Sequence, residues 1–128
     1  MSKTLQKILY VEDEKDIQLV ARIALETVGK FTVTVCNNGV EAIEAFARVN
    51  PDLVLLDVMM PDMDGPTTLQ RLRQTPGGET VAAVFMTAKV QPHEIAELKQ
   101  LGALDVIAKP FDPMTLPETI QTIWAENA

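Results

Sequence analysis

Hydrophobic stretches with strand-like and helix-like spacing alternate along the chain. Five short apolar runs are each followed by a longer segment in which apolar residues recur every three or four positions. Repeated strand and helix units of this kind favour a parallel sheet that is covered by helices on both faces. The pattern predicts five strands, at about 7–12, 31–36, 52–57, 81–87 and 104–108.

Five helices are predicted, at about 14–29, 38–48, 65–74 and 91–101 and from near Pro117 to the end. Proline lacks an N–H, so the last helix is expected to begin close to it. In that helix Leu116, Ile120, Ile123 and Trp124 share one face, where Trp124 is expected to pack. The inward residues of the first two helices are predicted to be Ile17, Val20, Ala21, Ala24, Leu25 and Val28, then Val40, Ile43 and Ala47.

Length and composition limit the classes of protein. The 128 residues are 47% hydrophobic, enough for one core, and we expect a single domain over 1–128 with no output domain. A net charge of -7 argues against a nucleic-acid-binding surface. Neither a signal peptide nor a membrane span is apparent, and the single Cys36 cannot form an internal disulfide, so a cytoplasmic location is expected. Cys36 is interpreted as a packing residue.

Acidic residues lie at the ends of the first and third predicted strands. The apolar run 8–11 leads directly into Glu12 and Asp13, and Asp57 ends the apolar run 53–56. Ligands of open α/β sheets bind at the carboxyl ends of the strands, so these acids are expected to meet there. Like charges repel, and oxygen-only ligands suit a hard divalent cation. The sequence therefore predicts a magnesium site.

Two further polar groups lie at the ends of the fourth and fifth predicted strands. Thr87 closes the fourth predicted strand and Lys109 follows the fifth. With Asp57 as a carboxylate nucleophile, they supply a hydroxyl and an ammonium beside the metal-binding acids. Phosphoryl transfer to a carboxylate needs in-line placement and neutralised equatorial oxygens, which magnesium and Lys109 would provide.

These motifs resemble a known family. Over its whole length the chain is similar to response-regulator receiver domains of two-component signalling, of the CheY-like kind. The matching elements are Glu12-Asp13, Asp57, the turn 61–65, Thr87-Ala88 and Lys109-Pro110-Phe111. The resemblance implies a doubly wound, flavodoxin-like sheet of five parallel strands in the order 2-1-3-4-5 with five flanking helices.

The resemblance also implies roles for individual residues. Asp57 would be the phosphoacceptor, and Mg²⁺ would be bound by Glu12, Asp13, Asp57 and the backbone carbonyl of Met59. The phosphoryl-binding and switch residues would be Thr87, Ala88 and Lys109, and the Lys109–Pro110 peptide bond would be cis. Met59 and Lys89 occupy positions that influence how fast the acyl phosphate is hydrolysed in the family.

The function that follows is a phosphorylation-dependent signalling switch and not an enzyme. A histidine kinase or a histidine phosphotransfer protein would donate the phosphoryl group. The switch would act on a downstream protein through the fourth helix, fifth strand and fifth helix. No nucleic-acid or membrane partner is expected, and the chain is expected to be a monomer or a weak dimer linked to phosphorylation.

One position departs from the family pattern. Receivers usually carry Tyr or Phe three residues before the lysine, whereas this chain has Val106. The backbone or another side chain would then have to transmit the movement of Thr87. Val106 also motivates an alternative, a phosphorylation-independent binding module with the receiver fold, and a receiver fragment of a longer regulator is a further alternative.

A phosphotransferase of the haloacid-dehalogenase kind is the main alternative from another class. Such enzymes carry a second acid two residues after the nucleophile, where this chain has Met59. A calcium loop around Asp62 and Asp64 is excluded because the required acids are missing, so these two residues are predicted to serve the turn and the helix cap.

Overall fold

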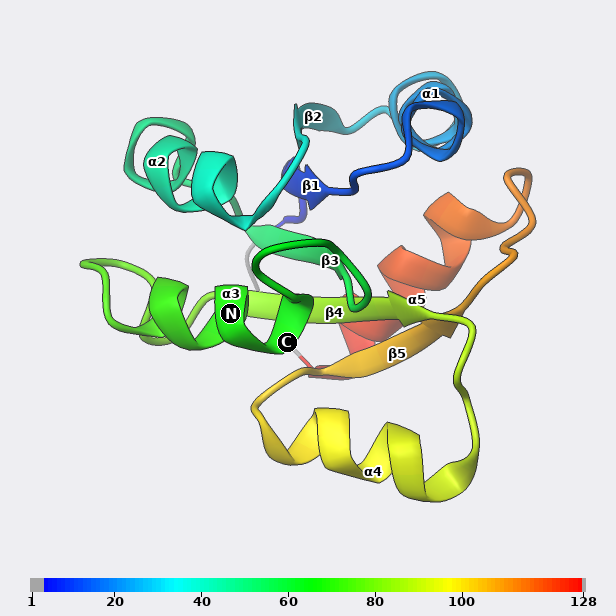
Figure 1. The fold of residues 1–128 in the computed structure, drawn as a ribbon. Helices are drawn as coiled ribbons and strands as arrows, with labels where there is room; N and C mark the ends of the chain where they lie inside the picture. The colour runs from blue at the N-terminus through cyan, green and yellow to red at the C-terminus, as the bar shows by residue number, and fades with distance from the viewer. Residues whose placement is uncertain (1–3, 128) are drawn as a thin grey trace.

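Five parallel strands form one sheet with helices on both faces (Figure 1). The structure is a computed structural model that describes residues 4–127. The strands are β1 (Lys7–Val11), β2 (Thr32–Cys36), β3 (Leu53–Asp57), β4 (Ala82–Thr87) and β5 (Asp105–Ala108). Their spatial order is β2-β1-β3-β4-β5, which confirms the predicted doubly wound fold.

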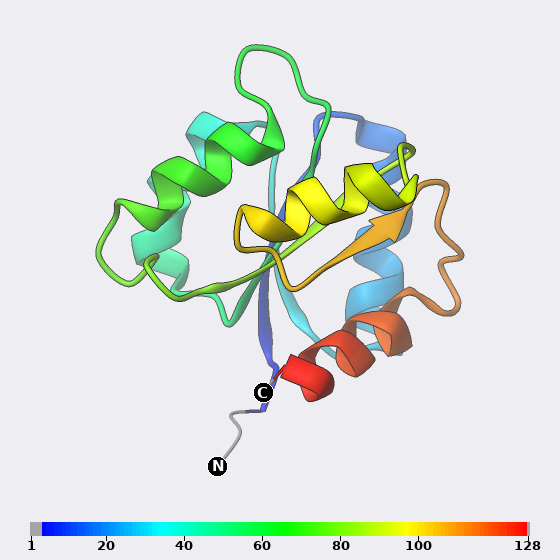
Figure 2. The same cartoon turned by 90° about the horizontal axis from the view of Figure 1, so that it is seen from below.

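The helices form two layers around the sheet (Figures 1 and 2). α1 (Lys15–Ile23) and α5 (Leu116–Asn127) cover one face, while α2 (Gly39–Val49), α3 (Gly65–Arg73) and α4 (Pro92–Gln100) cover the other. A crossover helix follows each of the first four strands, as parallel connections require. Among residues 4–127, we find no helix with the length and apolar character needed to traverse a lipid bilayer.

The central strand explains the longest apolar run. Every residue of β3 is buried, because helices pack against both of its faces. Its side chains alternate between two cores. Val54 and Leu56 join the core beneath α2, α3 and α4, whereas Leu53 and Leu55 join the core beneath α1 and α5.

The first helix differs from its prediction in form. The α-helix ends at Ile23 and continues as one wider π-helical turn, Ala24–Val28, closed by a hydrogen bond from the Gly29 N–H to the Ala24 carbonyl. Such a turn holds more residues than an α-turn and changes the phase of the side chains that follow. Val28 is therefore exposed, and Val20 lies on the flank of the helix and is also exposed. Their predicted core positions were wrong.

The second helix buries a different stripe from the one predicted. Ala42, Ala45 and Phe46 lie in the core, whereas Val40 and Ala47 are exposed, so their prediction as inward residues was wrong. The physical reason is the size of Phe46, whose burial sets the rotation of the helix. In contrast, α5 follows its prediction: it begins at Leu116, and Trp124 packs against the same core as Ile120 and Ile123.

Candidate functional site

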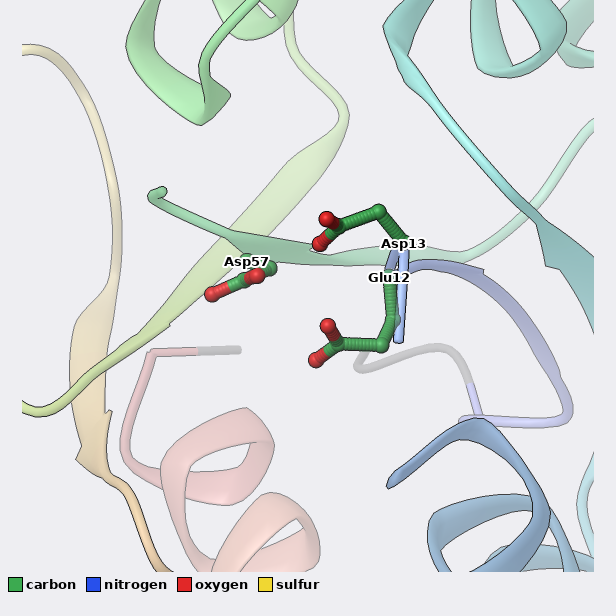
Figure 3. A group of neighbouring side chains, drawn as sticks. All are labelled: Glu12, Asp13 and Asp57. Atoms are coloured by element: carbon green, nitrogen blue, oxygen red, sulfur yellow. The ribbon is translucent and has the colours of Figure 1, made fainter. Parts of the chain in front are cut away.

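Three carboxylates converge at the carboxyl ends of two neighbouring strands. β1 pairs with β3 in a register that matches Val11 with Leu56, so Glu12 and Asp57 come next to each other. One oxygen from each of Glu12, Asp13 and Asp57 lies within 4.8 Å of the other two. Figure 3 shows the three side chains reaching toward one shared space. Glu12 and Asp57 are buried, and Asp13 is half-buried.

Lys109 brings the positive charge. Its Nζ lies 3.0 Å from Oε1 of Glu12 and 3.3 Å from Oδ1 of Asp57. The backbone N–H of Lys109 donates to the carbonyl of Thr87 at 2.9 Å, which ties the ends of β4 and β5 together. The Lys109–Pro110 peptide bond is cis. Lys109 therefore contacts two of the three carboxylates.

The pKa values of Glu12, Asp57 and Lys109 reflect the excess of negative charge in the site. Burial raises the pKa of Glu12 to about 7, although the hydrogen bond from Lys109 opposes the rise. Burial also raises the pKa of Asp57, against the opposing charge of Lys109. For Lys109 burial acts to lower the pKa, but its hydrogen bond to Glu12 and the charge of Asp57 outweigh that effect and raise it. The site holds more negative charge than Lys109 compensates.

The unbalanced acids fit a divalent cation. Oδ1 of Asp13 is buried and accepts no hydrogen bond from any residue in the described range 4–127. A buried acceptor without a donor is uncommon. The donor set contains only oxygen, which hard cations such as Mg²⁺ prefer. The cluster of Glu12, Asp13 and Asp57 could therefore bind a metal ion.

The loop after β3 is held close to Asp57. The Gly65 N–H donates to the Val58 carbonyl at 2.9 Å, and a Cβ on Gly65 would collide with the carbonyl oxygen of Asp57. Asp64 caps α3 by accepting a hydrogen bond of 2.8 Å from the Thr67 N–H, as predicted from the turn. Met59 lies in this loop with its side chain exposed.

Thr87 lies at the same edge of the sheet as the acids. Asp57 pairs with Met86, so Thr87 is one residue beyond Asp57 along the neighbouring strand. Thr87 is buried, and its hydroxyl oxygen accepts a hydrogen bond of 3.1 Å from the Lys89 N–H. Ala88 is exposed at the start of the loop. The structure thus brings the predicted residues of β1, β3, β4 and β5 together.

Val106 lies away from the acids, in the middle of β5. It pairs with Phe85 and is half-buried against the core beneath α2, α3 and α4. A hollow of about 560 Å³ opens between β5 and α5, and Val106 forms part of its lining with Ile107 and Ile123. The acidic side chains of Asp105, Glu118 and Glu126 also line this hollow.

Gln18 also supports the site, although the sequence analysis did not single it out. It is buried on α1, and its Nε2 donates to the backbone carbonyl of Glu12 and to Oδ1 of Asn37 at 2.9 Å. Asn37 in turn donates from its backbone N–H to Glu41 at 2.9 Å. These contacts fix the loop that presents Glu12. A polar residue within the apolar stripe of the first helix was the available signal.

A doubly wound sheet with acids, a threonine and a lysine at its carboxyl edge defines a class of signalling domain. Comparison with protein families identifies this class. The chain belongs to the response regulator receiver domain family, whose sequence profile matches residues 8–121. Receiver domains act as switches in two-component signalling. The predicted family is confirmed.

Individual relatives support this membership. The chain is 37% identical over 114 residues to the uncharacterized 14.6 kDa protein in the sodA1 3′ region of Leptolyngbya boryana, covering 89% of this chain and 86% of that protein. It is 34% identical over 116 residues to the transcriptional regulatory protein CseB of Streptomyces avermitilis, covering 91% of this chain but 48% of CseB. The chain thus spans about half the length of that regulator.

A solved structure has the same fold. Chemotaxis protein CheY4 of Vibrio cholerae superimposes with a TM-score of 0.85 at 28% identity, covering 94% of this chain and 99% of CheY4. The helices and strands that carry the carboxyl edge of the sheet are therefore arranged as in a receiver domain.

Proposed function

We propose that the chain is a phosphorylation-dependent signalling switch that accepts a phosphoryl group on Asp57 from a histidine kinase or a histidine phosphotransfer protein. The observation that carries the proposal is the placement of Asp57, whose carboxylate lies within 4.8 Å of the other two acids and contacts Lys109 at 3.3 Å. A buried carboxylate with a cation on one of its oxygens is positioned as a nucleophile.

The transfer forms one bond and breaks one. An oxygen of Asp57 attacks the phosphorus of a phosphohistidine in line, the phosphorus–nitrogen bond breaks, and the imidazole keeps the electron pair. Charge on the equatorial oxygens must be neutralised as this happens. Lys109 is 3.3 Å from Oδ1 of Asp57 and close enough to serve this purpose.

Glu12, Asp13 and Asp57, with the Met59 backbone carbonyl, would hold Mg²⁺ in this site. Bound Mg²⁺ would neutralise charge on the phosphoryl oxygens. The buried, unpaired Oδ1 of Asp13 supports this assignment. In the protein as it stands, Lys109 is the cation that holds Glu12 and Asp57 together.

Phosphorylation of Asp57 would act on the loops that follow β4 and β5. The new phosphoryl oxygens accept hydrogen bonds from the Thr87 hydroxyl, the Ala88 N–H and the Lys109 ammonium. Because the Lys109 N–H is already bonded to the Thr87 carbonyl, the ends of β4 and β5 would move together. Val106 cannot report this movement by an aromatic rotamer change, so the backbone carries it to a downstream protein.

The proposal is tested by intact-mass measurement after incubation with Mg²⁺ and a small phosphoryl donor such as phosphoramidate or acetyl phosphate. The wild type and Asp62→Asn should each gain one phosphoryl group, and Asp57→Asn should gain none. Asp62 is an exposed acid in the neighbouring turn and provides the matched change. An equal adduct on Asp57→Asn would refute the assignment.

Two further outcomes separate the alternatives. If phospho-histidine donors also fail to modify the wild type, the phosphorylation-independent binding module becomes the better explanation. Sustained release of phosphate from external phosphomonoesters would instead indicate a turnover enzyme. We do not expect such turnover, because Met59 stands where the haloacid-dehalogenase class needs its second acid.

A further inference from the structure

Gln18 is a buried polar residue on α1, the helix that follows the loop of Glu12 and Asp13. Its Nε2 donates to two acceptors, the backbone carbonyl of Glu12 and, at 2.9 Å, Oδ1 of Asn37. Gln18 and Ala21 are the two buried residues of α1. A buried amide is costly unless it is hydrogen-bonded, and an apolar residue at this position would avoid that cost. The glutamine is therefore expected to serve the groups that it contacts.

The neighbouring groups fix the direction of the Gln18 amide. The side chain of Glu41 can only accept, so Asn37 turns its donors toward it, the backbone N–H at 2.9 Å and Nδ2 at 3.0 Å. Oδ1 of Asn37 then faces Gln18, and Lys15 also donates to this oxygen. Gln18 must in turn present Nε2 to Asn37 and to the Glu12 carbonyl, because the reversed amide would set oxygen against two oxygens. The network thus holds Gln18 as a donor.

The carbonyl that Gln18 holds belongs to the peptide bond between Glu12 and Asp13. This planar unit joins the two acids directly, so its orientation sets the direction in which both side chains leave the backbone. On its other side Glu12 is fixed by its own N–H, which donates to the Cys36 carbonyl at 3.0 Å. A rotation of the peptide between the acids would move Glu12 and Asp13 together, and the hydrogen bond from Gln18 opposes that rotation.

We propose that Gln18 is a positioning residue for the Mg²⁺ site, which raises the affinity for the ion by holding the peptide between Glu12 and Asp13. The proposal rests on the proposed function, which assigns Mg²⁺ to these acids and Asp57. Residues that orient metal ligands without touching the metal contribute about tenfold or more to its affinity, because the ligands are already ordered when the ion binds. Through Asn37 the same network ties the site to the first turn of α2.

The test compares the wild type with Gln18→Met in the 128-residue chain. Methionine is uncharged and of similar length but has no donor. Urea denaturation in a chelator measures the structural effect of the change, and the rise of stability over a series of Mg²⁺ concentrations gives the dissociation constant. We expect Gln18→Met to bind Mg²⁺ about tenfold more weakly than the wild type. An unchanged dissociation constant would overturn the proposal, whatever the stability in chelator.

Asn37 and Asn38 provide a matched pair of neighbouring residues. Asn38 caps α2 by accepting a hydrogen bond of 2.9 Å from the Glu41 N–H. Asn38→Ala should therefore lower the stability but leave the dissociation constant for Mg²⁺ within about twofold of the wild type. Asn37→Ala removes the acceptor that orients Gln18 and should weaken Mg²⁺ binding. Equal affinities in the two alanine variants would refute the proposal, and this comparison holds even if Gln18→Met does not fold.

A double mutant shows whether Asn37 acts through Gln18. In the Gln18→Met background, Asn37→Ala should cause no further loss of Mg²⁺ affinity, because the amide that Asn37 orients is already gone. A general loosening of the protein would instead give losses that add, and additive losses would contradict the proposal.

Failure of this inference and failure of the proposed function have different signatures. If Mg²⁺ binds the wild type and Gln18→Met equally well and phosphoramidate modifies Asp57 in both, the role of Gln18 is refuted and the proposed function stands. If Mg²⁺ does not stabilise the wild type, the assignment of the metal site is refuted and the role of Gln18 with it.

Discussion

Replacing Glu12 by glutamine should stabilise the metal-free protein at alkaline pH. Glu12 is fully buried, and its pKa is raised from the ordinary value of 4.5 to about 7, first by burial and then by the charge of Asp57. A folded-state pKa above the unfolded value means that the folded protein binds the proton more tightly. Stability from this group is therefore greatest below pH 4.5 and falls as the pH rises through about 7.

The size of the effect follows from the same values. A tenfold change in proton affinity is worth about 1.4 kcal/mol. The rise from 4.5 to about 7 therefore costs the ionised folded protein roughly 3 kcal/mol at pH 8. Glutamine removes this cost but offers Lys109 a weaker acceptor, so we expect a net gain of about 2 kcal/mol. At pH 4.5 the gain should vanish.

The assay is urea denaturation in the presence of a chelator at pH 8 and at pH 4.5. Glu44→Gln makes the same chemical change on an exposed surface of α2 and should alter stability by less than about 0.5 kcal/mol at both pH values. Adding Mg²⁺ at pH 8 should stabilise the wild type more than Glu12→Gln. A variant no more stable than the wild type at pH 8, or equally stabilised at both pH values, would refute the reasoning.

Three other properties can be checked on the same protein. Asp64→Ala should lower stability by about 1 kcal/mol in urea denaturation, because the Thr67 N–H at the start of α3 loses its cap; an unchanged midpoint would contradict this. Leu55→Ala should cost about 2–5 kcal/mol by the same measurement, since it leaves a cavity in a fully buried strand, and a loss below 1 kcal/mol would show that the core collapses around it. Cys36 should resist alkylation until the protein unfolds, because burial raises the pKa of its thiol to about 11; rapid labelling of the native protein by iodoacetamide would overturn that expectation.

The strands were predictable because their burial leaves little freedom in their composition. A strand covered on both faces must be apolar throughout, as β3 is, and the polar residue that ends such a run marks the open edge of the sheet. The positions of Glu12, Asp57 and Thr87 follow from that rule, whereas Lys109 follows β5, which contains Asp105 and is only partly buried. Their register was not predictable from the runs themselves, because a parallel pairing depends on how the crossover helices pack.

The buried face of a helix was harder to predict than a strand, because one helix can carry more than one stripe of apolar residues. On α2 the residues Val40, Ile43 and Ala47 recur at helical spacing, but so do Ala42, Ala45 and Phe46. The larger gain comes from burying the aromatic ring, and the structure buries the second stripe. The π-helical turn after α1 is a similar case, since a change of phase at Ala24 leaves no mark in the spacing.

Tyr10 shows which features of a site escape sequence patterns altogether. On period-two alternation it is simply a core residue of β1, and its burial in the core beneath α1 and α5 agrees with that. The environment of its hydroxyl depends on Glu12 and Asp57, whose charges add to burial in raising the pKa of Tyr10. Asp57 is far from Tyr10 in the sequence, so no local pattern reports that its charge acts on the hydroxyl.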